Sequence, residues 1–375
     1  MGSKRAMLGN GLGEALSRSL IGADRVFDLF TGSAAVAWHV AERHGKEVIA
    51  SDLQQYSTIL AAAVIERTEP ITDLTWVGKW LEDAKTKLAD HQEWKLLNDH
   101  QASLVGADPA VAACDARTID LGDAYPISKA YGGHYFSPWQ AAWVDALRTS
   151  LPSSPMLKNL ALAALIQAAS RCAASPGHTA QPFKPNDTAG PFLLEAWQRD
   201  LPSIIHARIK DLGPRYAKVR GVAHCGDALS IADQARAGDL AFVDPPYSGV
   251  HYSRFYHVLE TIARGHVGQV TGHGRYPPAA ERPSSSFSMK RTAEKAFDDL
   301  LARLAARGAR VIITFPASQA SNGLSGSDVK QIAAEHFRIA EEKVTSRFST
   351  LGGDTKHRAA RLDTDELILS LSAHA

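Results

Sequence analysis

The chain of 375 residues is 45% hydrophobic, so it can bury a substantial core in one large domain or two medium ones. Its 41 basic and 40 acidic residues give a net charge of +1, which excludes a broadly basic surface that binds nucleic acid without regard to sequence. Any contact with nucleic acid must therefore come from a local patch of charge.

The spacing of cysteine, histidine and apolar residues excludes several kinds of site. Cys114, Cys172 and Cys225 lie far apart, which argues against a zinc site or a disulfide framework and fits a reducing cytosol. The 15 histidines form no His-Glu-x-x-His or comparable cluster, so we predict no metal. The longest apolar stretch, 160–169, is too short to span a bilayer, and no signal peptide is recognisable. We expect a soluble, cytoplasmic protein that binds no membrane.

The first predicted elements are a strand over 26–30 and a helix over 35–43. The turn between them reads Asp28-Leu29-Phe30-Thr31-Gly32-Ser33-Ala34. Its small residues let a ligand approach the backbone, and the helix N-terminus offers unpaired N–H groups. The pattern is typical of a cofactor loop, although turns of this type also occur without a ligand.

A second predicted strand, over 47–50, ends in Ser51-Asp52, and Asp52 lies 20 residues after Gly32. An acidic side chain at this distance lies at the tip of the second strand of a βαβ unit, where it can accept both hydroxyls of a ribose. Asp52 would serve equally well as the N-cap of the helix predicted over 54–67. Only the combination with the preceding loop favours a nucleoside cofactor.

The middle of the chain is predicted to be helical. Between 74 and 219 there is little strand pattern, and helical patterns cover 77–104, 138–147, 156–172 and 192–211, the last broken at Pro202. This interruption predicts a helical domain, residues 74–218, inserted into a domain formed by residues 1–73 and 219–375.

Strand and helix patterns alternate again in the last third of the chain. Predicted strands cover 219–225, 240–243, 309–315, 338–348 and 366–371, and predicted helices cover 252–264, 292–307 and 328–336. The alternation predicts an α/β fold with a mostly parallel sheet, helices on its faces and a site at the carboxyl ends of its strands. The last two strands, joined through Gly352-Gly353, are predicted to form an antiparallel edge pair.

The motif Asp244-Pro245-Pro246-Tyr247 follows the predicted strand 240–243. It combines a carboxylate, a rigid turn and an aromatic ring at a strand's exit. The Asp244 carboxylate and the Pro245 carbonyl can both accept hydrogen bonds from a planar amino group, while Tyr247 stacks on the attached ring. The motif indicates chemistry on the amino group of a base.

A ribose-binding acid and an amine-binding motif in one chain suggest S-adenosylmethionine as cofactor and a base amino group as methyl acceptor. On these residues the chain resembles the Dam-like (D12-type) adenine-N6 DNA methyltransferases. The resemblance implies a Rossmann-like S-adenosylmethionine-dependent methyltransferase sheet with a helical target-recognition domain between its cofactor half and its catalytic half. Small ribosomal-RNA guanine methyltransferases share a similar motif but have no comparable insert, which favours DNA over RNA as the substrate.

The resemblance also implies roles for individual residues. Gly2-Ser3-Lys4-Arg5 resembles an N-terminal element that lies against the cofactor, and Cys225-Gly226-Asp227-Ala228 resembles a segment whose aspartate contacts the cofactor's adenine. The implied cofactor-binding residues are Lys4, Asp28, Phe30, Gly32, Asp52 and Asp227, and the implied catalytic residues are Asp244, Pro245, Pro246 and Tyr247. Methyl transfer is expected to be direct, without a covalent enzyme intermediate.

DNA contacts are predicted from local composition. Because a duplex hides the adenine amino group, the enzyme must rotate the base out, and basic or aromatic residues near the motif suit this task. Residues 199–220 include six basic residues and two acidic ones, a surplus of four positive charges. Such a surplus can bind phosphates, but it is also typical of a solvated helix face. The candidate DNA contacts are His178, Gln181, Lys184, Arg208, Lys210, Arg215, His251 and Arg254.

Two other classes of function stay open on the residues alone. One is methylation of cytosine N4 or of RNA; an Asp rather than a Ser at the head of the motif favours adenine. The other is a catalytically inactive DNA-binding protein of the same fold, suggested by Ala34, which replaces the second glycine of the family's Phe-x-Gly-x-Gly motif. A cognate restriction enzyme is a further partner compatible with the resemblance.

Overall fold

The computed structural model describes residues 4–349 and 361–374, so Gly2, Ser3, Gly352 and Gly353 lie outside the described residues. The chain divides into two compact units. The first contains Met1–Glu69, Tyr216–Tyr252 and Pro283–Ala375, and the second contains Pro70–Arg215 and Ser253–Arg282. The sequence prediction had divided the chain near residues 74 and 219 and had assigned all of 253–282 to the catalytic part. In the structure this segment packs with the helical unit.

The first unit is built on a seven-stranded sheet with the order β3-β2-β1-β4-β5-β7-β6. The strands are β1 (Arg25–Asp28), β2 (Glu47–Asp52), β3 (Val222–Cys225), β4 (Leu240–Val243), β5 (Arg310–Pro316), β6 (Arg338–Ser349) and β7 (Arg361–Ser372). Strands β1 to β5 pair in parallel, whereas β7 is antiparallel to both β5 and β6. The predicted α/β fold, with an antiparallel pair at one edge, is confirmed.

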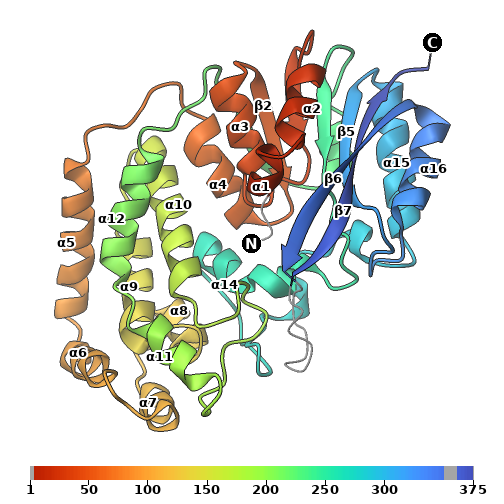
Figure 1. The fold of residues 1–375 in the computed structure, drawn as a ribbon. Helices are drawn as coiled ribbons and strands as arrows, with labels where there is room; N and C mark the ends of the chain where they lie inside the picture. Colours follow the sequence, from red (N-terminus) through yellow and green to blue (C-terminus); the bar gives the residue numbers. More distant parts are fainter. Residues whose placement is uncertain (1–3, 350–360, 375) are drawn as a thin grey trace. The chain divides into compact units, whose positions relative to one another are not determined.

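Helices cover both faces of this sheet (Figure 1). On one face the strand residues Phe27, Val243 and Ile313 share an apolar cluster with α13 (Ala228–Ala232), α15 (Ala293–Ala306) and α16 (Gly326–His336). The helices α2 (Leu12–Ser19), α3 (Ala35–Arg43) and α4 (Gln55–Ile65) pack against other strand residues. All four residues of β4 are buried, as expected for a parallel strand covered on both sides.

The second unit is helical. Its helices are α5 (Thr75–Ala89), α6 (Trp94–Ser103), α7 (Pro109–Ala116), α8 (Pro126–Tyr131), α9 (Pro138–Thr149), α10 (Pro155–Cys172), α11 (Gly190–Trp197), α12 (Leu201–Leu212) and most of α14 (Tyr252–Arg264). Residues 74–219 are all described by the structure, and their only β-structure is an isolated bridge between Gly132 and Phe136. The helix predicted over 77–104 is two helices, and the break predicted at Pro202 falls earlier, where the Asp200 side chain accepts the N–H of Ser203 and caps α12.

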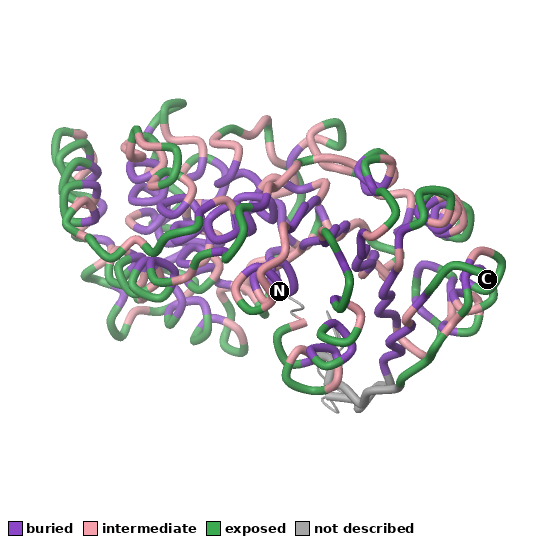
Figure 2. Tube along the Cα trace, turned by 90° about the horizontal axis from the view of Figure 1, so that it is seen from above, coloured by how far each residue is buried: buried purple, intermediate pink, exposed green. Residues whose placement is uncertain are grey.

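The amphipathic pattern of α5 shows how the helical unit forms its core. Val77, Trp80, Ala84 and Leu88 recur at helical spacing and are all buried. The alternation of buried and exposed residues along such helices can be followed in the trace of Figure 2. Within the described part of the chain, no helix combines the length and the apolar character that crossing a membrane requires.

Candidate active site

Three acidic residues meet at the carboxyl edge of the sheet. Asp28 ends β1 and pairs in register with Ala50 of β2 and Phe242 of β4, while Asp52 ends β2 and Asp244 directly follows β4. Because these neighbouring strands are parallel, their carboxyl ends lie at the same edge. The structure therefore brings together the acids that the sequence had placed at three separate strand exits.

The Asp52 carboxylate joins two turns of the backbone. Its Oδ2 accepts the N–H of Gly32 at 2.9 Å, and its Oδ1 accepts the N–H of Gln54 at 2.9 Å. The spacing of 20 residues noted in the sequence thus corresponds to a direct contact. Gln54, not Asp52, is the N-cap of α4, so the alternative assignment of Asp52 as the cap of this helix is wrong.

The turn after β1 contains two residues in the left-handed region. Gly32 has φ = 52° and Ala34, the N-cap of α3, has φ = 61°. Glycine adopts this conformation freely, whereas the Cβ of an alanine is crowded there. A Cβ built at Gly32 would approach no atom more closely than the Phe30 carbonyl oxygen, at 3.8 Å, so the surface above this residue is open.

Asp28 is buried beneath the same turn. Its Oδ2 accepts the N–H of Ala37 at 3.1 Å. Burial first, and then the negative charges of Asp244 and Asp52, raise the pKa of the Asp28 carboxyl to about 8. Asp28 is therefore largely protonated at physiological pH, which limits the negative charge that accumulates beside Asp52 and Asp244.

Phe30 and Asp227 lie at the margins of this edge. The Phe30 ring is half-buried and meets the edge of the Phe287 ring, with centroids 5.0 Å apart. Asp227 is the N-cap of α13, where its carboxylate accepts the N–H of Leu229 at 2.9 Å. The preceding Gly226 donates its N–H to the carbonyl oxygen of Asp52 at 3.0 Å. The loop that carries Asp227 is thereby attached to the end of β2.

The Asp244 carboxylate is held through one of its two oxygens. Oδ1 accepts the Thr314 hydroxyl at 3.0 Å and lies 3.1 Å from Nζ of Lys4. The same ammonium forms an ion pair with Glu366, whose side chain is fully buried. Among the described residues, Asp244 Oδ2 has no hydrogen-bond partner. The described residues therefore fix only one of the two carboxylate oxygens.

Lys4 remains charged in this position. Burial alone would lower the pKa of its ammonium, but the charges of Asp244 and Glu366 raise it above its ordinary value. The sequence had predicted Lys4 as a cofactor contact, whereas the structure places its ammonium between these two carboxylates. Lys4 therefore contributes a permanent positive charge next to the motif.

The remainder of the motif is held by a turn at residues 321–322. Asn322 is buried and donates its side-chain amide to the carbonyl oxygens of Pro246 at 3.2 Å and Phe287 at 3.0 Å. Gly249, just beyond the motif, donates its N–H to the Ser321 hydroxyl at 2.8 Å. These contacts order the loop without involving the Asp244 carboxylate.

The Tyr247 ring packs at the inner side of this loop. It meets the Phe315 ring edge-on, with centroids 6.4 Å apart. Burial and the nearby Asp244 carboxylate raise the pKa of the Tyr247 phenol to about 12. The ring therefore remains a neutral aromatic surface at physiological pH.

The sequence analysis missed Glu366 and Thr314. Glu366 pairs with Pro316 at the carboxyl end of β5, because β7 runs antiparallel and brings its first half to this edge. An acidic residue immediately before the apolar run 367–369 was a signal, but it acquires meaning only from the strand's direction. Thr314 directly follows Ile313, which pairs with Val243, and this register sets its hydroxyl beside Asp244.

Comparison with known proteins agrees with this arrangement. Residues 1–98 and 198–307, together more than half of the chain, match the D12 class N6 adenine-specific DNA methyltransferase family. The chain belongs to this family. The first matched segment contains Asp28 and Asp52, and the second contains Asp244.

Two curated relatives of this D12-family chain are modification enzymes. Over 307 residues, 80% of the chain, it is 24% identical to the type II methyltransferase M.FokI of Planomicrobium okeanokoites. Over 69 residues, 18% of the chain, it is 41% identical to the modification methylase LlaI of Lactococcus lactis subsp. lactis. The matched regions span 42% and 11% of these relatives, so the chain covers less than half of their length.

The residues predicted to contact DNA are distributed over both units of this D12-family chain. His251 belongs to the first unit, where it is half-buried, and the other candidates belong to the second. His178 is buried with its ring edge-on to Phe255, at 5.2 Å between centroids, and its Nδ1 accepts the N–H of Ala180 at 3.2 Å. The His178 side chain therefore already packs on Phe255 and bonds to the backbone of Ala180.

The remaining candidates are more accessible. Arg208 is paired with Asp211 at 2.7 Å, which already neutralises its charge in part. Arg215 is half-buried. The exposed candidates are Gln181, Lys184, Lys210 and Arg254. The charge surplus predicted over 199–220 already counts Asp211, but Glu195 lies outside that range and pairs with Arg199 at 2.8 Å, which reduces the surplus.

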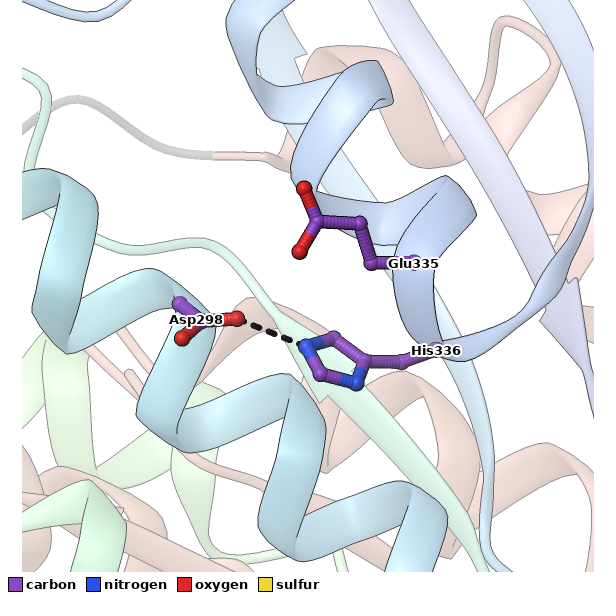
Figure 3. A group of neighbouring side chains, drawn as sticks. All are labelled: Asp298, Glu335 and His336. Atoms are coloured by element: carbon purple, nitrogen blue, oxygen red, sulfur yellow. Dashed lines mark hydrogen bonds and ion pairs between the residues drawn. The ribbon is translucent and has the colours of Figure 1, made fainter.

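Asp298, Glu335 and His336 form a separate group of possible metal ligands on α15 and α16 (Figure 3). One ligand atom from each lies within 4.8 Å of the others, and His336 Nε2 lies 2.7 Å from Asp298 Oδ1. The residues come from two helices, so a search for sequence motifs could not detect the group. The direct contact between Asp298 and His336 is a hydrogen bond or an ion pair, which explains why these two side chains lie together.

Proposed function

We propose that the protein transfers a methyl group from S-adenosylmethionine to the N6 amino group of adenine in DNA. The observation that carries the proposal is the Asp244 carboxylate, whose Oδ1 is held by Thr314 and Lys4 while Oδ2 has no hydrogen-bond partner among the described residues. The family's description supports adenine N6 as the acceptor, and the relatives' names support methyl transfer.

The residues at the sheet edge fit S-adenosylmethionine as the methyl donor. The cofactor carries a positively charged sulfonium, and the carboxylates of Asp52 and Asp244 follow or end strands at this edge, although burial keeps the neighbouring Asp28 largely protonated at physiological pH. The backbone there is also open, since a Cβ built at Gly226 would have no atom within 4 Å. We propose that Lys4, Asp28, Phe30, Gly32, Asp52 and Asp227 bind the cofactor, with Asp52 accepting the ribose hydroxyls. When bound, the cofactor supplies an electrophilic methyl group.

The chemical role of the motif is to position the acceptor. Asp244 Oδ2 and the Pro245 carbonyl accept the two N6–H hydrogens and draw the nitrogen lone pair out of conjugation with the ring. Pro246 stiffens the turn, and the neutral Tyr247 ring stacks on the base. Asp244 need not be a strong base, because the amine becomes acidic only after it has been methylated.

The second unit is proposed to select the DNA site. DNA with a flipped-out adenine is the expected substrate, and Gln181, Lys184, Lys210 and Arg254 are its exposed candidate contacts. The less accessible candidates are His178, Arg208, Arg215 and His251. Two of them, His178 and Arg208, already have partners within the chain. The relatives' names also motivate a cognate restriction enzyme as a functional partner.

Sequencing DNA from cells that express the protein, with detection of modified bases, tests this function. N6-methyladenine at a defined sequence, absent with Asp244→Ala, is the expected result. N4-methylcytosine, or modification confined to RNA, would identify a different acceptor. Cofactor binding without any modified base would instead identify a catalytically inactive DNA-binding protein.

A further inference from the structure

Tyr276 is held rigidly within the second unit. Its backbone exchanges two hydrogen bonds with Thr271, each of 2.9 Å, and its hydroxyl donates to the carbonyl oxygen of Ala180 at 2.7 Å. Gly274 is required by this packing, since a Cβ there would lie 2.4 Å from the ring carbon Cζ of Tyr276. The ring thus joins the turn 271–276 to the loop that contains Gln181 and Lys184.

Two arginines lie against this ring. Cζ of Arg254 is 4.6 Å from its centroid, and Cζ of Arg282 is 5.8 Å from it. An aromatic ring attracts a guanidinium and orients it without neutralising its charge. Both cations are therefore placed by the same rigid residue, although 28 positions separate them in the sequence.

Neither arginine has a carboxylate partner among the described residues. Arg264, on the same helix as Arg254, is by contrast paired with Glu260 at 2.7 Å. Nε of Arg282 is buried and has no hydrogen-bond acceptor in the described part of the chain. A buried donor without an acceptor costs free energy, so this guanidinium is incompletely satisfied within the unit.

The third neighbour of the ring, His257, carries no charge. His257 packs on Tyr276 with centroids 5.1 Å apart. Burial first, and then the charges of Arg282 and Arg254, lower the pKa of His257 to about 4, so it is neutral at physiological pH. The cluster of Tyr276, Arg254, Arg282 and His257 consequently carries two uncompensated positive charges.

We propose that Arg254 and Arg282, oriented by Tyr276, bind phosphate groups of the DNA backbone. Guanidinium groups are well suited to phosphate because their planar N–H donors match its oxygens. In the sequence, Arg254 follows Tyr247 by seven residues. The proposal rests on the DNA substrate proposed above and adds Arg282 and Tyr276 to its binding surface.

The test measures the salt dependence of binding to a short duplex, using the full chain with Arg254→Ala, Arg282→Ala and the double substitution. Each phosphate contact contributes about 0.9 to the slope of log K against log salt concentration, so the double variant should lose about two units of slope. Its KM for DNA should rise, while kcat at saturating DNA is retained. S-adenosylmethionine affinity should not change.

Matched controls separate a phosphate contact from loss of structure or of bulk charge. Lys95→Ala removes an exposed cation that is already paired with Asp99 at 2.6 Å, and it should leave the slope unchanged. Tyr276→Phe keeps the ring and should keep the slope, whereas Tyr276→Leu removes the cation–π contact and should weaken DNA binding. Arg254→Lys and Arg282→Lys keep the charge and should keep most of the slope while lowering affinity.

The outcomes distinguish this inference from the proposed function. A parental slope in a folded double variant that still methylates adenine would overturn the phosphate contact alone. A reduced slope in a protein whose parent methylates no DNA would support the contact and overturn the methylation. If the double variant unfolds, a parental slope in both folded single variants would overturn the proposal.

Discussion

Nζ of Lys4 lies 3.1 Å from Oδ1 of Asp244, although the two residues are 240 positions apart in the sequence. The N-terminal segment thereby places a fixed positive charge on the carboxylate that follows β4. Since Lys4 and Thr314 share the same oxygen, the carboxylate is oriented before any substrate binds. A preorganised acceptor of this kind avoids the cost of reorientation during the reaction.

We expect Asp244→Ala to abolish methyl transfer while S-adenosylmethionine binding persists. The substitution removes the charged acceptor proposed for the target amine, and losing one such group costs about two to three orders of magnitude in rate. Single-turnover kinetics at saturating cofactor measure this loss. Near-normal turnover would exclude the proposed role, and Asp244→Asn, which keeps the shape of the side chain, controls for packing.

Glu366→Gln tests whether the buried glutamate positions Lys4. The substitution keeps the size of the side chain but removes one of the two carboxylates around the ammonium. We expect kcat to fall about tenfold, equivalent to 1.4 kcal/mol, with an unchanged KM for the cofactor. Thr314→Val, which removes only the hydroxyl bonded to Asp244, should produce a loss of similar kind. An unchanged kcat in both variants would show that Asp244 needs no such support.

Asp52→Ala should weaken S-adenosylmethionine binding by roughly 1.5 to 3 kcal/mol, the range for hydrogen bonds to a charged group. The carboxylate also holds the N–H groups of Gly32 and Gln54, so part of the loss will come from a less ordered turn. Asp52→Asn retains an acceptor without the charge and should lose less. Titration calorimetry measures both variants, and parental affinity in Asp52→Ala would limit this residue to a structural role.

The raised pKa of Asp28 predicts a pH dependence of stability. An unfolded aspartate titrates near pH 4, whereas Asp28 titrates near 8 in the folded chain, so between these values the folded state retains a proton that the unfolded state has lost. Stability contributed by this group therefore falls as the pH rises from about 4 to about 8. Asp28→Asn should flatten that fall in the melting temperature. An identical decrease in the variant would assign the effect to other groups.

The local patterns of the sequence predicted the parts of the site that depend on one strand and its exit. Asp28, Asp52 and Asp244 each follow or end an apolar run, and parallel pairing alone brings their strand ends together. The position of Glu366 could not be predicted in this way, because it depends on the antiparallel direction of β7.

The packing of residues 253–282 with the helical unit could not be predicted from the sequence either. The helical pattern of 252–264 was recognised, but amphipathic periodicity does not specify which core a helix packs against. The contacts that attach this segment are nonlocal. Thr179, for example, donates both its N–H, at 2.7 Å, and its hydroxyl, at 2.9 Å, to the carbonyl oxygen of Phe255.

Ala34→Gly is expected to tighten cofactor binding severalfold. The left-handed conformation of Ala34 costs about 1–2 kcal/mol, and its Cβ lies in the turn proposed to approach the cofactor. Because the methyl group is buried, its loss costs about 0.8 kcal/mol, so overall stability should change by less than about 1 kcal/mol. Ala35→Gly is the matched control: this neighbour lies in the first turn of α3, where glycine should destabilise the helix and leave the affinity unchanged. Calorimetric titration with S-adenosylmethionine compares the two variants, and a weaker affinity in Ala34→Gly would show that the alanine methyl supports the cofactor loop instead of restricting it.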